Sequence, residues 1–245
     1  VLKRNPHLKT TSLVGAMPYG GEAKDHNQIE ELGIAPYLFK DSETNFRFVY
    51  AGAMLPKAYK VLEAVFQAIR ENPHKFRNTV FHFIGTGKTP GDENGYNIKP
   101  LAEKYGLWQS VIFEYPRRIP YLDVLVHLKN AHAVFVLGST EPHYTPSKVF
   151  QAVLSQKPLL AVLHCRSTAV DVVRDANAGL VLSFDGEREV EGICTRFAAF
   201  FDQFKIYAEQ FSPASVNMDL FEKYSARNAT RELVSMLNTA IGNHK

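Results

Sequence analysis

The chain has 245 residues, of which 45% are hydrophobic and 22% are charged, and its net charge is +3. This composition is typical of a globular protein, and the small charge argues against a nucleic-acid partner. No run of about 20 apolar residues is present, so no transmembrane segment is predicted. The two cysteines, Cys165 and Cys194, lack the spacing of a zinc site and fit a reducing compartment.

Short apolar runs alternate with longer amphipathic segments, which predicts alternating strands and helices. The predicted strands span residues 46–51, 79–84, 110–113, 133–137, 158–163 and 179–183. The predicted helices span residues 57–70, 99–105, 121–130, 147–155, 168–176, 188–210, 215–223 and 226–241. Strands joined by helices over short connections favour an α/β fold, a doubly wound parallel sheet with helices on both faces.

The first 45 residues differ from the rest of the chain. A strand is predicted at residues 11–17, and a polar stretch without periodicity follows at residues 22–45. Because the chain opens without a start methionine, we expect a piece of a longer protein. The predicted division is residues 1–45 as a linker or the remnant of a preceding acceptor domain, 46–212 as a nucleotide-sugar-binding Rossmann-like domain, and 213–245 as helices that pack on it or cross back to a missing N-terminal half.

The loop after residue 137 is the most informative candidate site, since ligands of an open parallel sheet bind beyond the carboxyl ends of its strands. It runs through Pro146 into a predicted helix, whose free amides at Ser147, Lys148 and Val149 would attract an anion. The Lys148 ammonium and the Ser147 hydroxyl suit a diphosphate, and the Glu141 carboxylate suits sugar hydroxyls. The same residues also fit an ordinary helix cap, a solvated lysine and a surface glutamate.

Several other classes of site are disfavoured. Two small turns, at residues 52–54 and 85–87, allow a ligand to approach the backbone, but neither is the GxGxxG fingerprint of an NAD-dependent oxidoreductase. No GxSxG elbow of a Ser-His-Asp hydrolase is present. No DxD-type carboxylate pair follows an apolar strand, so a metal-dependent sugar transferase is disfavoured, and neither a metal nor another cofactor is predicted.

Six motifs follow one another in a familiar order, at residues 48–54, 83–87, 111–115, 133–141, 146–158 and 171–179. The most specific is PSKVFQAVLSQKP at residues 146–158. Together they resemble the C-terminal, donor-binding domain of GT-B-fold retaining glycosyltransferases of the family 4-like group, over about residues 46 to 184. Two positions depart from that family, which often has arginine where Ala53 stands and usually glutamate where Gln151 stands.

The resemblance implies a role for each candidate residue. Glu141 would contact the donor sugar, and Ser147 and Lys148 would hold the diphosphate, with Glu141 and Lys148 as the catalytic pair. The other predicted contacts are Gly52 and Lys57 to the phosphates, Gln151 to the ribose, and Tyr115 to Arg117 near the base. Ala53, Gly85, Thr86, Tyr144, Thr145 and Pro146 complete the predicted donor site.

The resemblance therefore implies a glycosyltransferase of the hexosyltransferase type, incomplete without a preceding acceptor-binding domain. It would transfer a sugar from a nucleoside-diphosphate donor, such as a UDP-sugar, to a hydroxyl of a carbohydrate or lipid-linked acceptor, without a metal. Polysaccharide or glycoconjugate biosynthesis is the expected process, in the cytoplasm or at the inner membrane surface. Two alternatives stay open, a sugar-nucleotide epimerase of the same fold and a non-catalytic nucleotide-binding or interaction module.

Overall fold

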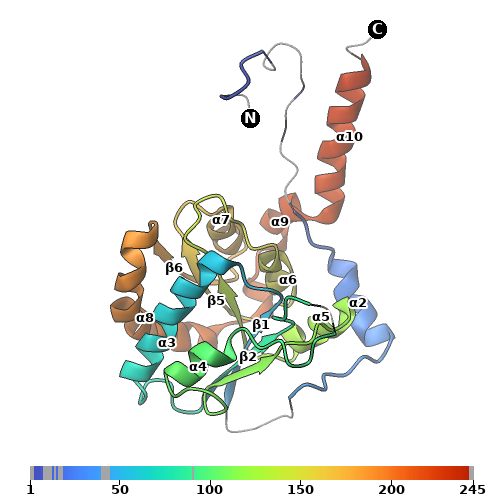
Figure 1. The fold of residues 1–245 in the computed structure, drawn as a ribbon. Coiled ribbons are helices and arrows are strands. Elements are labelled where there is room, and N and C mark those ends of the chain that lie inside the picture. Colours follow the sequence, from blue (N-terminus) through green and yellow to red (C-terminus); the bar gives the residue numbers. More distant parts are fainter. Residues whose placement is uncertain are drawn as a thin grey trace.

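One parallel sheet forms the centre of the molecule. The computed structural model describes residues 3–7, 13, 15, 19–39, 45–89 and 91–242. The sheet has the strand order β3-β2-β1-β4-β5-β6, and all neighbouring strands are parallel (Figure 1). The strands are β1 (Phe46–Ala51), β2 (Thr79–Ile84), β3 (Ile112–Tyr115), β4 (Ala133–Leu137), β5 (Leu159–His164) and β6 (Gly179–Phe184). The predicted fold class is confirmed.

Helices cover both faces of this sheet and divide the core in two. One face packs against α3 (Tyr59–Glu71), α4 (Lys99–Lys104) and α8 (Val190–Gln210). The other packs against α5 (Tyr121–Lys129), α6 (Lys148–Leu154) and α7 (Thr168–Asp175). Because successive strand residues point to opposite faces, Phe48 belongs to the first core and Val49 to the second.

Most predicted elements lie within two residues of the observed ones, and three differ in detail. Strand β3 begins at Ile112 rather than at residue 110, because the amides of Ser110 and Val111 donate to the carbonyl of Leu107 in a tight turn. The helix predicted from residue 57 begins as a 3-10 turn at Pro56–Ala58. The helix predicted at residues 215–223 is instead a short α9 (Met218–Phe221) between the 3-10 turns Pro213–Ser215 and Glu222–Tyr224.

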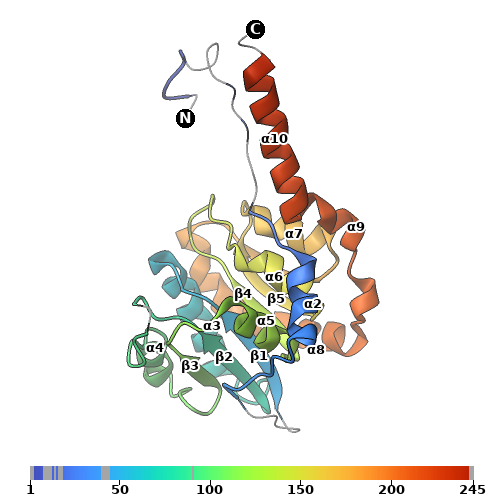
Figure 2. The same cartoon turned by 90° about the vertical axis from the view of Figure 1, so that its right-hand side faces the viewer.

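The prediction that residues 22–45 lack regular structure is wrong for α2 (Ala23–Glu31). This helix packs beside α5 (Figure 2). Glu22 caps it by accepting a hydrogen bond from the amide of Lys24 at 3.0 Å. Only His26 and Ile29 are buried within α2, so its apolar periodicity is too weak to see in the sequence. Of the strand predicted at residues 11–17, all but residues 13 and 15 lie outside the described residues.

The last helix, α10 (Ala226–Gly242), extends away from the sheet domain (Figure 1). Ala229 is its one buried residue, whereas Leu233, Leu237 and Ile241 are exposed. Within the described residues, no helix combines the length and the apolar character that crossing a membrane requires. The predicted domain boundaries at residues 45 and 212 stay predictions.

Candidate functional site

A cavity of about 590 Å³ lies where the order of the strands reverses, between β1 and β4. These two strands pair only at Phe48 with Ala133 and at Val49 with Val134, so their carboxyl ends separate. Open parallel sheets bind ligands at this type of crevice. Six predicted site residues line the cavity: Gly52, Ala53, Tyr144, Ser147, Lys148 and Gln151.

The Lys148 side chain, on α6, contacts residues at the carboxyl end of β1. Its Nζ donates hydrogen bonds to the hydroxyl of Tyr50 and, at 3.2 Å, to the carbonyl oxygen of Ala53. Nζ also lies 3.7 Å from the centre of the Tyr50 ring, a cation–π contact. Burial lowers the pKa of Lys148 to about 7, because removal from water disfavours the charged amine.

The backbone conformation at the end of β1 favours glycine at position 52. Its φ is 102°, a backbone conformation that side-chain-bearing residues rarely adopt. A Cβ placed on Gly52 would lie 3.7 Å from Nζ of Lys148. This distance is an ordinary van der Waals contact, so an added methyl group would touch the lysine amine on that side.

The start of α6 offers fewer free amides than predicted. The amide of Val149 donates to the carbonyl of Pro146 at 3.0 Å, so the prediction of a free amide at Val149 is wrong. Because this amide already has an acceptor in the first turn of the helix, it is not available to a ligand. In the described part of the chain, the amides of Ser147 and Lys148 have no such partner, and the exposed Ser147 hydroxyl makes no capping bond.

The opposite wall of the cavity is acidic and comes from the unpredicted helix α2. Gln151, the predicted ribose contact, has its Oε1 3.1 Å from Nε2 of His26. Glu22 and Asp25 line the cavity, and Asp25 accepts a hydrogen bond from the hydroxyl of Tyr121 at 2.8 Å. Lys148 is the one basic residue among the described residues that line this cavity.

Glu141 pairs with Lys57 and does not line the cavity that holds Lys148. The Lys57 Nζ and Glu141 Oε1 atoms are 3.3 Å apart, and the two side chains are 56% and 45% exposed. The loop after β1 and the loop after β4 thus meet through this ion pair. Sequence reasoning placed both residues at the site without predicting that they would contact each other.

A second cavity, of about 570 Å³, lies beyond the carboxyl end of β3. Tyr115 and Arg117, predicted near the base, line it together with Tyr37, Leu38 and other residues. Nη1 of Arg117 forms an ion pair with Oε1 of Glu93 in this wall, at 2.9 Å. The predicted base loop therefore has a cavity of its own.

Glu114 is a key residue that the sequence reasoning did not single out. Its buried carboxylate accepts hydrogen bonds from the amides of Asn97, Ile98 and Lys99 at 2.8–2.9 Å and from the Thr86 hydroxyl. The hydroxyl of Thr86, which was predicted in the donor site, therefore donates a structural hydrogen bond to Glu114. A carboxylate within a half-buried strand was the available signal.

The remaining predicted residues hold the loop and turn in place. Oγ1 of Thr145 lies 2.6 Å from Oγ1 of Thr168, and the carbonyl of Tyr144 accepts a hydrogen bond from the Ser167 hydroxyl at 2.7 Å. Pro146 is buried. Gly85 has a φ of 67°, which suits the turn that ends β2.

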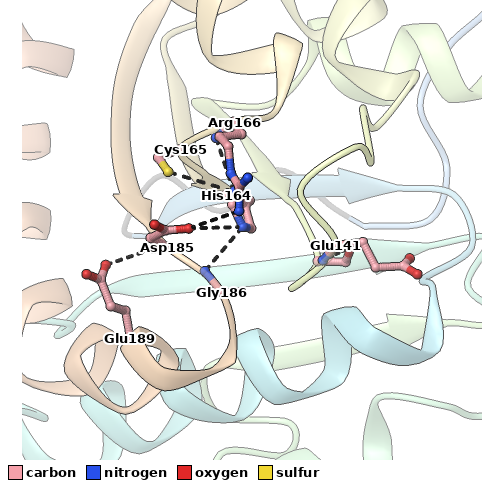
Figure 3. A network of polar contacts seen from close by, with 8 residues as sticks. Glu141, His164, Cys165, Arg166, Asp185, Gly186 and Glu189 are labelled. Carbon is pink, nitrogen blue, oxygen red and sulfur yellow. Dashed lines mark hydrogen bonds and ion pairs between the residues drawn. The ribbon is translucent and has the colours of Figure 1, made fainter. Parts of the chain in front are cut away.

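His164, Cys165 and Asp185 form a cluster at the carboxyl ends of β5 and β6, with ligand atoms within 4.8 Å of one another (Figure 3). The distances would suit a metal ion. However, the amides of Arg166 and Gly186 lie 3.1 and 3.2 Å from the two ring nitrogens of His164. The Arg166 guanidinium also lies 3.6 Å from the Asp185 carboxylate. These contacts indicate a structural link between β5 and the loop after β6.

No protein-family model and no curated protein matches the chain. Solved structures do. An α,α-trehalose 6-phosphate synthase from Burkholderia multivorans matches with a TM-score of 0.62 and 12% identity, over 96% of this chain and 52% of that one. A sucrose-phosphate synthase from Thermosynechococcus elongatus matches with a TM-score of 0.58 and 11% identity, over 98% and 57%. The pneumococcal O-GlcNAc transferase GtfA, solved with UDP and GlcNAc, matches with a TM-score of 0.56 and 14% identity, over 84% and 38%.

The chain has the fold of a GT-B glycosyltransferase domain. The resemblance to the C-terminal domain of these enzymes is confirmed at the level of the fold. The chain spans about half the length of the two synthases. Fold similarity does not by itself assign an activity, which has to be argued from the site.

Proposed function

We propose that this chain is the donor-binding domain of a glycosyltransferase that transfers a sugar from a nucleoside-diphosphate sugar to an acceptor hydroxyl. The observation that carries the proposal is the Lys148 amine at the strand-reversal cavity of a fold shared with glycosyltransferases. Its acceptor would be a carbohydrate or a lipid-linked saccharide, bound together with a second domain, in polysaccharide or glycoconjugate biosynthesis.

The diphosphate is assigned to the wall formed by Gly52, Ser147 and Lys148. A phosphate there would accept hydrogen bonds from the Ser147 and Lys148 amides and from the lysine Nζ. These donors would stabilise the charge that develops on the departing diphosphate. Nζ donates to the Tyr50 hydroxyl and to the Ala53 carbonyl, and a phosphate oxygen would take the place of the Ala53 carbonyl as its acceptor.

The nucleoside is assigned to Gln151 and to the cavity beyond β3. Gln151 would bind the ribose after giving up its contact with His26. The base would enter the cavity beside Tyr115 and Arg117. Consecutive residues, Pro120 and Tyr121, line the second and the first cavity respectively, which supports the proposal that one extended ligand occupies both.

The sugar is assigned to the Glu141–Lys57 pair, which joins the loops after β1 and β4. The Glu141 carboxylate would accept hydrogen bonds from sugar hydroxyls, and Lys57 would hold its orientation or contact the phosphates. Both groups are about half exposed, so a ligand can reach them without unfolding a neighbour.

A second candidate is a non-catalytic module that has kept the fold without the donor site. The acidic wall favours this candidate, since Glu22 and Asp25 face a cavity with one basic residue, and Ala53 supplies no cation. Two carboxylates near a diphosphate cost binding free energy unless the ligand displaces α2.

Calorimetry with UDP, GDP and their sugar conjugates tests the proposal. We expect binding by the unchanged chain, and loss of binding in Lys148→Met. The matched control is Lys60→Met, which removes an exposed lysine paired with Glu187. Binding of none of the nucleotides would favour the non-catalytic module, and equal effects of the two lysine variants would contradict the assigned diphosphate site.

A further inference from the structure

Residues 34–39, here called the strap, connect α2 to the segment before β1 and cover part of β2. The Phe39 ring stacks on the imidazole of His82 in β2, with ring centres 4.4 Å apart. The guanidinium of Arg47 lies 5.0 Å from the centre of the same Phe39 ring. Tyr37 and Leu38 of the strap form one wall of the 570 Å³ cavity beyond β3.

His127 on α5 fastens the strap through its backbone. Its Nε2 accepts hydrogen bonds from the amides of Tyr37 and Leu38, each at 3.1 Å. Its Nδ1 lies 2.6 Å from the carbonyl oxygen of Asp123, which can only accept, so Nδ1 must carry the proton. His127 is fully buried, and the ring is therefore held neutral with its lone pair directed at the strap.

Protonation of Nε2 would break both contacts at once. The added N–H would point at two N–H donors, so the Tyr37 and Leu38 amides would lose this acceptor at a part-buried position. No alternative acceptor is supplied by the ring, because its other nitrogen already donates to Asp123. The geometry alone thus requires neutral His127 for the strap to stay in position.

The charged and titratable groups around His127 act in both directions. The Asp123 carboxylate, which accepts the Tyr37 hydroxyl at 3.1 Å, favours a protonated ring. Burial opposes it and is the larger effect, so the pKa of His127 lies below its ordinary value of 6.5. His82 and Arg47 lie on the strap's other side, and burial, with Arg47 and His127 nearby, lowers the pKa of His82 to about 4.

We propose that His127 is a positioning residue that holds the strap as one wall of the cavity beyond β3, and that its protonation releases this wall. The occupant of that cavity, a nucleobase, rests on the proposed function, whereas the release of the strap does not. The sign follows from linkage. The folded chain holds His127 neutral, so the strap is held above pH 6.5 and loosens as the pH falls below it.

Hydrogen exchange of the Tyr37 and Leu38 amides measures the fastening directly. We expect their protection factors to fall by about tenfold from pH ~7.5 to pH ~5, while the amides of the central strand β4 keep theirs. His127→Gln places an amide oxygen near the position of Nε2 that accepts at every pH. This variant should keep the protection at neutral pH and lose its pH dependence. His127→Leu should lower the protection at every pH, and His143→Gln, in an exposed loop, serves as the control.

An acid transition of the strap that is the same in His127→Gln as in the unchanged chain would overturn the proposal. So would full protection of both amides at the lower pH. If His127→Leu does not fold, the comparison of the glutamine variant with the unchanged chain still decides the point.

Nucleotide affinity provides the second readout. If one molecule in about ten keeps the wall at the lower pH, the apparent dissociation constant there is about tenfold higher than that of His127→Gln, which shares the titration of Lys148. Absence of nucleotide binding at neutral pH would contradict the proposed function but not the fastening, since hydrogen exchange reports the strap without a ligand. If the Tyr37 and Leu38 amides lost protection at low pH but nucleotide affinity stayed the same, the strap would not shape the nucleotide-binding site.

Discussion

The two cavities at the carboxyl edge of the sheet are built in different ways. The cavity at the strand reversal is lined by residues of β1, α2, α5, α6 and α10 together with loop residues between them, and its chemistry depends on one amine, Lys148, and on the acidic start of α2. The cavity beyond β3 is bounded largely by irregular segments, which Glu114 and His127 hold through backbone amides. Charge therefore governs the first cavity, and the hydrogen-bonded shape of two loops governs the second.

Glu114→Ala should have the largest effect and should separate the cavities most clearly. It leaves three backbone amides and the Thr86 hydroxyl without their acceptor, which costs about 3–5 kcal/mol of unfolding free energy. Urea unfolding measures the loss. Glu93→Gln, in an exposed ion pair of the same cavity, should cost less than about 1 kcal/mol. Equal costs would show that the loop does not depend on Glu114.

Removal of the Lys148 charge should act on binding, with a cost of about 1.5–3 kcal/mol, or roughly 10- to 150-fold in affinity. The same charge makes binding pH-dependent. Since the pKa of Lys148 is about 7, its amine loses the proton as the pH rises through 7, and diphosphate affinity should fall. The contribution of Lys148 becomes constant only below about pH 6, where the amine is almost fully protonated. Calorimetry between pH 6 and pH 9 checks this expectation. Lys148→Met is the control, because its affinity should not depend on pH through this group.

Stability should respond to the same group with the opposite sign. The unfolded chain binds a proton at Lys148 up to its ordinary value of 10.5, whereas the folded chain releases it near 7. Between pH 7 and pH 10.5 the unfolded state therefore binds more protons than the folded state. The free energy of unfolding increases with pH over this range. A comparison of the unchanged chain with Lys148→Met by urea unfolding isolates this contribution, and parallel pH curves would contradict it.

Gly52→Ala should have a smaller effect on stability, of about 1–2 kcal/mol, because alanine at a φ of 102° is strained. Nucleotide affinity should fall as well, since the new methyl group would contact Nζ of Lys148. Gly33→Ala is the matched control, with a positive φ of 62° but nothing within 4 Å of the added carbon. If both variants lowered affinity equally, the contact with Lys148 would be irrelevant.

Glu141→Gln should have the smallest effect on stability, below about 1 kcal/mol, because its ion pair with Lys57 is exposed to water. If Glu141 contacts the donor sugar, this variant should weaken binding of the sugar nucleotide and leave binding of the nucleoside diphosphate unchanged. Calorimetry with both ligands distinguishes the two. If the affinity for both ligands fell equally, Glu141 would contact the phosphates rather than the sugar.

The fold was largely predictable because its signals are local. Strands β1, β2 and β4 have the predicted ends, since strands buried on both faces are continuous apolar runs. Helix α2 was not predicted because only two of its residues are buried. Strand β3 was predicted two residues too early because the turn at Leu107 does not change the pattern of apolar residues. The loop after β4 was predictable as a candidate site from its position and from Lys148.

The partners of these side chains were not predictable, because they depend on elements far apart in the chain. The order of the strands brings Lys57 to Glu141 and the Tyr50 hydroxyl to Lys148, across more than 80 residues in each case. Only the folded chain places α2 over Gln151 and the strap on His127. The sequence by itself determined the alternation of strands and helices, since burial repeats with a local period. The tertiary structure decided which polar groups meet, because sheet order and long connections set those distances.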